Sequence, residues 1–279
     1  MNDESLIRLS AFFGVLIVMS VWQALFPRRK LSQGYHRWPA NLGIVLLNSL
    51  ILRWLFPAGA IGASLWAEGQ DLGLLNMVSL SPVASIIIAV ILLDLSIYLQ
   101  HLLFHAMPLL WRLHMVHHAD RDIDVTTGLR FHPIEILLSM LIKMGVVVLL
   151  GAPVLAVLIF EIVLNGMAMF NHANAKLPYA LDRIIRTLFV TPDMHRVHHS
   201  VIRHETNSNY GFNLSVWDRL FGTYIAQPES GHSNMTIGLS QFLQEPAHRI
   251  TWMLRLPFTG NVGQYPIIKS TSGKGEANE

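Results

Sequence analysis

Residues 94–118 read DLSIYLQHLLFHAMPLLWRLHMVHH, and the pattern of polar and apolar residues in this stretch is the strongest indication of the fold. Its first half is apolar except for Asp94, Tyr98, His101 and His105 and a few uncharged polar residues between them. These four residues follow one another at intervals of four, three and four, which places them on one face of an α-helix. The pattern predicts a hydrophobic helix that carries a polar, histidine-bearing face at its C-terminal end.

The composition of the whole chain indicates a membrane protein. Of its 279 residues 52% are hydrophobic and only 14% are charged, whereas soluble domains carry about 25% charged residues. The mean hydropathy is +0.42. The formal charge is only +2 and no basic run resembles a nucleic-acid patch, so the sequence gives no indication of nucleic-acid binding. The absence of cysteine excludes disulfides, thiolate zinc sites and iron–sulfur clusters, while histidine is frequent, at 14 residues.

Several apolar segments are long enough to cross a bilayer, which takes about 20 residues in a helix. Residues 6–26, 41–65 and 82–105 each predict one span. Residues 134–170 are apolar but are broken by Gly-Ala-Pro at 151–153, which predicts a hairpin of two short helices. The expected fold class is therefore all-α, a polytopic membrane helical bundle with a helical cap that holds a histidine-rich di-metal site.

Polar and charged residues in and around these segments lead to three further expectations. The first follows the acidic residues Asp3 and Glu4, which favours a retained membrane helix over a cleavable signal. Arg53 interrupts the second, so either that span is shorter or Arg53 faces protein. Residues 269–279 are rich in Ser, Gly, Lys and Glu and predict a disordered tail.

Charge asymmetry orients the predicted spans. The basic connector 28–37 is expected in the cytoplasm and the acidic connector 68–71 outside. The hairpin then returns the chain to the cytoplasmic side, where all histidine-rich regions meet. We expect three parts: N-terminal transmembrane helices at 1–80, a catalytic domain at 81–225, and a cytoplasmic extension at 226–279. From about residue 171 the chain lacks a convincing span, which predicts a cytoplasmic cap.

Histidine is concentrated in three clusters with helical spacing, which can direct two or three imidazoles at one point. The clusters are His101-x-x-x-His105, His114-x-x-His117-His118 and His195-x-x-His198-His199. Because one zinc ion needs four ligands, these eight imidazoles fit two metal ions with positions left open for oxygen. Imidazole binds Fe, Zn, Cu and Ni, so the ligand type alone does not choose the metal.

Two other classes of membrane protein are alternatives at this point. A zinc hydrolase needs three ligands and a general base, as in H-E-x-x-H, which the sequence lacks. A metal transporter places its ligands near the bilayer midplane, often in repeated halves. Here the clusters are expected at one face, and no internal repeat is visible.

Short motifs across residues 94–224 carry a resemblance to a known family. Besides the helix of 94–105 they are LWRLHMVHH (110–118), RFHPIE (130–135), NHAN (171–174), TPDMHRVHHS (191–200), NYG (209–211) and WDRLFGTY (217–224). In their order and spacing they resemble the fatty acid hydroxylase/sterol desaturase superfamily of integral-membrane di-iron enzymes. One departure is Leu102, where many members have arginine, which puts contacts around the ligands in doubt but not ligation itself.

The resemblance implies that the eight clustered histidines bind two Fe²⁺ ions, with zinc able to replace iron in purified protein. It also implies that His172 is a further ligand, whereas His132 either binds metal or hydrogen-bonds within the site. Since metal-bound histidines usually donate their second N–H to a carboxylate, Asp94 is expected to hold His101 or another ligand. Asp193 and Glu135 are weaker candidates for that role.

The implied activity is O₂-dependent hydroxylation or desaturation of a membrane lipid, with sterol-like, fatty acyl and related lipids all open as substrates. O₂ is then a co-substrate, and electrons must come from outside. The sequence contains no Gly-rich dinucleotide fingerprint and no recognisable haem domain. The expected partner is therefore a separate reductase, ferredoxin or cytochrome.

Overall fold

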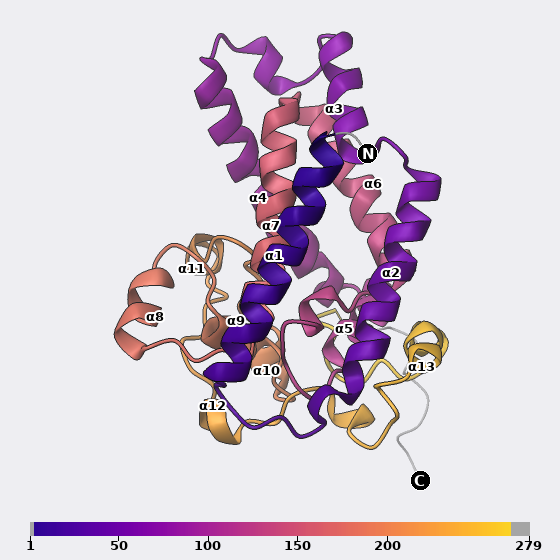
Figure 1. Ribbon diagram of the computed structural model, residues 1–279, viewed down its shortest axis with the longest axis vertical. Coiled ribbons are helices and arrows are strands. Elements are labelled where there is room, and N and C mark those ends of the chain that lie inside the picture. The colour runs from indigo at the N-terminus through magenta and orange to yellow at the C-terminus, as the bar shows by residue number, and fades with distance from the viewer. Residues whose placement is uncertain (1–2, 269–279) are drawn as a thin grey trace.

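The computed structural model describes residues 3–268, and within that range the chain is helical, with isolated β-bridges in place of strands. Figure 1 shows long helices above a layer of short helices and loops. The long elements are α1 (Asp3–Leu25), α2 (Trp38–Leu55), α3 (Gly59–Gly69), α4 (Pro82–Ala106), α5 (Pro108–His118), α6 (Pro133–Leu150) and α7 (Val154–His172). The short α-helices are α8 (Tyr179–Ile185), α9 (Pro192–His198), α10 (Arg203–Thr206), α11 (Val216–Leu220), α12 (Gly231–Asn234) and α13 (Ile250–Arg255). The 3₁₀ turns are η1 (Gly34–Arg37), η2 (Leu74–Met77), η3 (Thr127–Leu129), η4 (Ser240–Phe242) and η5 (Leu256–Phe258).

Five helical segments in the described range are long and apolar enough to cross a membrane. They are 4–25, 34–77, 82–106, 133–150 and 154–172. Many of their large apolar side chains are exposed, among them Phe13 at 53% and Ile17 at 61% on α1. Such exposure is expected where acyl chains, not water, surround the helix. The predicted all-α polytopic bundle is therefore confirmed, while the predicted tail at 269–279 lies outside the described residues.

The second predicted span, 41–65, lies within the segment 34–77, but it is not one continuous helix. Helix α2 ends at Leu55 and α3 begins at Gly59, so the segment 41–65 is broken in its middle. Pro57 explains the break, because proline has no N–H to donate and its ring clashes with the preceding helical turn. Arg53 lies exposed in the last turn of α2, which agrees with the shorter-span alternative.

The predicted hairpin of α6 and α7 is confirmed, and glycine makes its turn possible. Gly151 ends α6 in the left-handed conformation, with φ of 63°. Gly73, with φ of 111°, lies directly against it, so that a Cβ on Gly73 would overlap the Gly151 backbone. The turn between the two spans is thus packed against the connector that precedes α4.

Small side chains allow the membrane helices to pack closely. Ala60 and Ala63 of α3, Ala89 of α4 and Ala156 of α7 are buried in one apolar cluster with Phe160. Residues of this size let helix backbones approach each other within a bilayer. Helix α1 is joined to this bundle by an ion pair between Arg8 and Glu161 of α7.

Three of the charged side chains within the membrane helices form one paired group. Glu161 of α7 binds both Arg8 of α1 and Lys143 of α6. Pairing is expected of ionisable groups at this depth, because an isolated charge in hydrocarbon costs several kcal/mol. The triad therefore ties α1 laterally to the α6–α7 hairpin.

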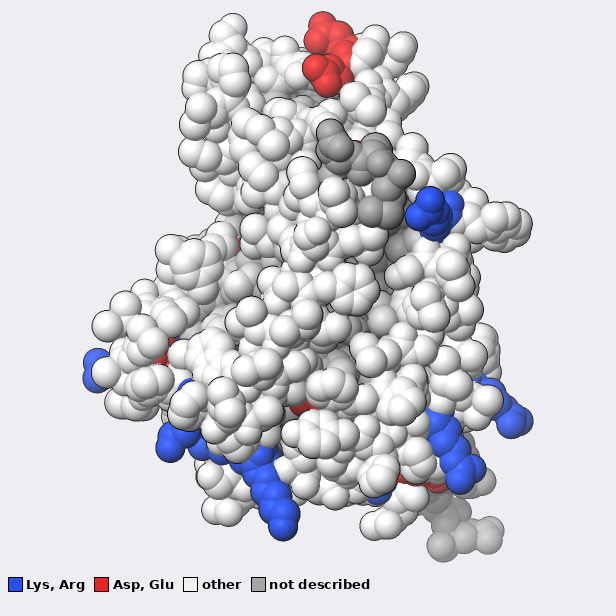
Figure 2. Space-filling view, viewed as in Figure 1, with Lys and Arg blue, Asp and Glu red and all other residues white. Residues whose placement is uncertain are grey.

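Residues 173–268 form a cap at the end of the bundle where α4 and α7 finish (Figure 1). Trp111 and Met115 of α5 are buried between Ile44 of α2 and the cap residues Phe242 and Met253. In the view of Figure 2 most cationic side chains gather at this end, and the largest acidic patch lies at the opposite end. The charge distribution favours a cytoplasmic cap by the positive-inside rule, and the orientation stays a prediction.

Candidate metal centre

Helix α4 positions the first histidine pair. Its buried face carries Asp94, Tyr98, His101 and His105, as the spacing predicts. Ser81 caps the start of this helix, where its hydroxyl accepts a hydrogen bond from the Ala84 N–H. The two histidines lie in its last two turns, at the boundary between the membrane helices and the cap.

Helix α5 follows after a single non-helical residue, Met107, and begins at Pro108. Because proline is well suited to the first position of a helix, the chain turns there and starts a new helix at once. His114, His117 and His118 lie in the last turns of α5, and all three are buried.

Helix α9 supplies the third cluster from the cap. Thr191 caps it by accepting a hydrogen bond from the Met194 N–H, and Pro192 occupies its first position. His195 and His198 lie on this short helix and His199 follows at its C-cap. The motif TPDMHRVHHS is therefore a capped helix whose sequence fixes both its start and its histidine-bearing end.

The structure brings nine histidines together in two groups. The ligating atoms within each group lie within 4.8 Å of one another. The first group is His101, His105, His114, His118 and His198, and the second is His117, His172, His195 and His199. Clusters two and three are each divided between the groups, since neighbouring residues on a helix point in different directions. The two groups adjoin, with the rings of His118 and His199 stacked at 4.6 Å.

Ring nitrogens approach one another within each group at distances that suit a shared ion. In the first group, Nε2 of His101 lies 3.1 Å from Nε2 of His114 and 3.0 Å from Nε2 of His198. In the second, Nε2 of His172 lies 3.1 Å from that of His117 and 3.0 Å from that of His195. Two nitrogens each about 2.1 Å from one ion, at about a right angle, are about 3.0 Å apart.

Protein oxygens hold the outward-facing nitrogens of several histidines. Nδ1 of His101 lies 2.8 Å from the Tyr210 carbonyl and that of His198 lies 2.7 Å from the Ser208 carbonyl. Nδ1 of His172 lies 2.6 Å from the Ala168 carbonyl. A carbonyl can only accept, so these rings donate from Nδ1 and leave Nε2 free to bind metal.

A carboxylate holds His114. Oε1 of Glu135, in the first turn of α6, lies 2.6 Å from Nδ1 of His114, and both side chains are buried. Carboxylate–histidine pairs of this kind orient metal ligands and raise their basicity. Glu135 was predicted as a weaker candidate than Asp94 for this role, because the sequence pattern does not show how closely α6 approaches α5.

The predicted contact between Asp94 and a histidine was wrong. Asp94 accepts hydrogen bonds from the Trp217 indole N–H at 2.8 Å and from the Leu214 N–H at 3.2 Å. The seven residues from Asp94 to His101 correspond to about 10 Å along a helix, which a short carboxylate cannot span. Asp94 fastens the cap segment 212–217 to α4 instead of orienting a ligand.

The remaining candidates have structural contacts outside the two groups. His132 caps α6, where its Nδ1 accepts a hydrogen bond from the Ile134 N–H, so it is not among the clustered histidines. Asp193 binds Arg196 and Arg28, and thereby links α9 to the connector after α1.

Burial keeps the histidines of α5 and α9 in the form that binds metal. It lowers the pKa of His114 to about 3 and that of His198 well below its usual value. Both rings are therefore neutral near pH 7. Both nitrogens of His118 and of His199 are buried without a hydrogen-bond partner in the described structure. Unsatisfied buried nitrogens are costly, and a metal ion in each group would satisfy them, so the residues fit two ions.

A buried ionic network, which was not predicted from the sequence, holds the loop that follows α5. Arg37 is 1% exposed and binds Asp120 and Asp124 in the loop after α5. Burial alone would raise the pKa of Asp120, but Arg37 and Arg130 hold it below its usual value. Arg130 also donates a hydrogen bond to the Val116 carbonyl, 2.8 Å away within α5. The acidic run DRDID at 120–124, which follows the second histidine cluster after Ala119, is the sequence signal for this network.

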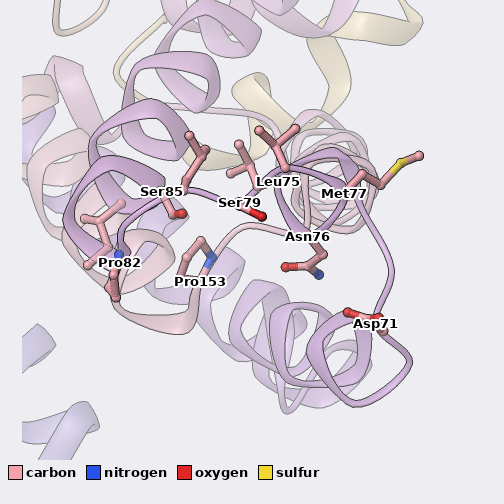
Figure 3. A pocket seen from close by; sticks show the side chains of 11 residues that line it. Asp71, Leu75, Asn76, Met77, Ser79, Pro82, Ser85 and Pro153 are labelled. Carbon is pink, nitrogen blue, oxygen red and sulfur yellow. The ribbon is translucent and has the colours of Figure 1, made fainter.

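A cleft of about 440 Å³ opens at the opposite end of the molecule, beside the start of α4. Figure 3 shows Asp71, Asn76, Ser79, Ser85 and Pro153 around it. The first residue of α4 is separated from His101 by nineteen positions, which is roughly 28 Å along a helix. This cleft is therefore remote from the histidines.

The family model for fatty acid hydroxylase matches residues 86–223. Ornithine lipid hydroxylase OlsE of Rhizobium tropici is 33% identical over 54% of this chain and 45% of its own. Alkylglycerol monooxygenase of Homo sapiens is 28% identical over 53% and 32%, respectively. Cholesterol 25-hydroxylase of Rattus norvegicus is 26% identical over 78% and 72%. No solved structure matches the chain significantly.

The chain thus spans less than half of the length of the first two of these relatives and about seven tenths of the third. The matched region contains most of α4 and all of α5, α6, α7 and α9, and with them all nine grouped histidines. The family match and the histidine motifs therefore coincide, and the chain belongs to the fatty acid hydroxylase/sterol desaturase superfamily.

Proposed function

We propose that this protein is a membrane-bound di-iron oxidoreductase that uses O₂ to hydroxylate or desaturate a membrane lipid. The observation that carries the proposal is the pair of adjoining groups of five and four buried histidines. Nine imidazoles exceed the need of a single hydrolytic zinc, which takes three protein ligands. Neutral nitrogen donors of this kind suit iron, among other metals.

Two iron ions, when bound, would activate O₂ for the cleavage of an unactivated C–H bond, which no side chain can achieve. The first group of histidines would hold one ion and the second group the other. The outer partners of these rings, Glu135 and the carbonyls of Tyr210, Ser208 and Ala168, orient them for that task. All nine rings are at most 6% exposed, so the surrounding protein excludes water from the site.

The proposed substrate is a lipid that reaches the site from the bilayer. All three reported relatives have names that specify action on a lipid or lipid precursor: an ornithine lipid, an alkylglycerol and cholesterol. The grouped histidines lie where α4 and α7 end, at the boundary of the membrane helices. The two electrons that O₂ chemistry requires would come from a separate reductase, ferredoxin or cytochrome.

Comparative lipidomics tests this proposal. Cells that express the protein under ¹⁸O₂ should contain a lipid that has gained one labelled oxygen atom, or one that has lost two hydrogen atoms. The variant His198→Ala, which removes one imidazole of the first group, should lose this product. Phe221→Ala, a change at a half-exposed ring outside both groups, is the matched control and should retain it. An unchanged lipid profile in expressing cells would refute the proposed activity.

A further inference from the structure

Phe131 contacts both histidine groups. Its ring stacks on His117 of the second group with 4.5 Å between ring centroids and an angle of 11°. It also lies 6.2 Å from the ring of His114, in the first group. Its main-chain carbonyl accepts a hydrogen bond, at 2.9 Å, from the side-chain amide of Asn48 on membrane helix α2. The backbone of Phe131 is thereby held by α2 while its ring lies against one histidine of each group.

Phe212 has the same relation to the two groups, although it comes from the cap. Its ring lies 6.3 Å from that of His101, in the first group, and 6.4 Å from that of His195, in the second. Its main-chain carbonyl accepts a hydrogen bond from the side-chain amide of Asn171, near the end of membrane helix α7. Each phenylalanine is thus attached to a membrane helix through an asparagine.

These two rings differ from the other aromatic neighbours of the histidines in their exposure. Phe104, Trp111 and Tyr210 also contact grouped histidines, and each is at most 1% exposed. Phe131 and Phe212 are only partly buried. Among the aromatic residues that contact the grouped histidines in the described range, Phe131 and Phe212 are therefore the ones with exposed surface.

We propose that Phe131 and Phe212 line the passage through which a lipid chain reaches the two metal positions, and that they determine which carbon reacts. The inference rests on the function proposed above. An acyl or sterol-like chain requires apolar walls, and these two side chains supply them beside one histidine of each group. Their anchored backbones give the passage a fixed width, so the size of each ring limits how far a chain can enter.

The test uses the full-length protein in membranes and measures three quantities. The variants are Phe131→Ala, Phe212→Ala and the milder Phe212→Leu, with Phe221→Ala as the control. Phe221 stacks on Tyr98 and is 50% exposed, and it contacts none of the nine histidines among the described ring contacts. Bound metal per chain reports folding, and the position of the new functional group reports substrate placement. A diazirine-bearing fatty acid, fed to the cells, reports proximity of lipid by photo-crosslinking.

We expect wild-type crosslinks at residues 129–133 and 210–214 and unchanged metal content in every variant. The alanine variants should move the reaction along the chain or raise KM by about 10-fold, the effect of a lost apolar contact in a pocket. Crosslinks confined to other segments, or wild-type KM and product position in both alanine variants, would overturn the inference. If wild-type protein makes no oxidised lipid, the proposed activity fails, while crosslinking still decides whether lipid occupies the passage.

Discussion

At the scale of single residues, the contact between Glu135 and His114 makes a direct prediction. Glu135→Gln replaces the carboxyl group that orients this ring, and such changes typically weaken metal binding by roughly 10–100-fold. Asp94→Asn is the matched control, because Asp94 contacts Trp217 and Leu214 and no histidine. Iron affinity of both variants, measured by competition with a chelator, checks this prediction. Equal losses in the two variants would contradict the distinction drawn between these carboxylates.

The histidines themselves could be predicted from sequence, because i, i+3 and i+4 spacing is a local property of a helix. The partner of Asp94 could not, since Trp217 approaches from the cap and no periodicity describes that approach. Likewise, the division of His117 and His118 between different groups depends on how α5, α7 and α9 are placed in space.

At the scale of elements, the turn between α6 and α7 allows a specific prediction about stability. Gly73→Ala would place a Cβ on the Gly151 backbone and would also strain a φ of 111°. We expect a clear loss of thermal stability in detergent, since both backbones must move. Gly145→Ala, within α6 and with no atom within 4 Å of its Cβ, should instead be neutral or stabilising by about 0.5–1 kcal/mol. Equal melting temperatures for Gly73→Ala and wild type would show that the contact is not tight.

Sequence predicted this hairpin from Gly-Ala-Pro at 151–153, since such residues end helices. Pro57 carries the same kind of signal inside the apolar segment 41–65, where α2 and α3 are separate helices. Hydropathy measures whether a segment is apolar enough to lie in a bilayer, but it does not show whether the segment forms one unbroken helix.

At the scale of the whole molecule, the orientation in the membrane can be measured directly. The chain contains no cysteine, so each introduced thiol is unique. In intact cells, a membrane-impermeant maleimide should label Asp71→Cys at once and Lys30→Cys only after permeabilisation. Both native residues are exposed, so neither change disturbs the core. The reverse labelling pattern would place the cap and the histidines outside the cytoplasm.

The central claim is that the two histidine groups hold two iron ions. The most direct measurement is the iron content of protein purified anaerobically from iron-supplied cells, combined with Mössbauer spectroscopy. We predict two iron ions per chain, in sites rich in nitrogen ligands, and a loss of bound iron in His105→Ala and His195→Ala, which each remove a member of one group. A protein that oxidises lipid with a single ion, or with none, would contradict the account.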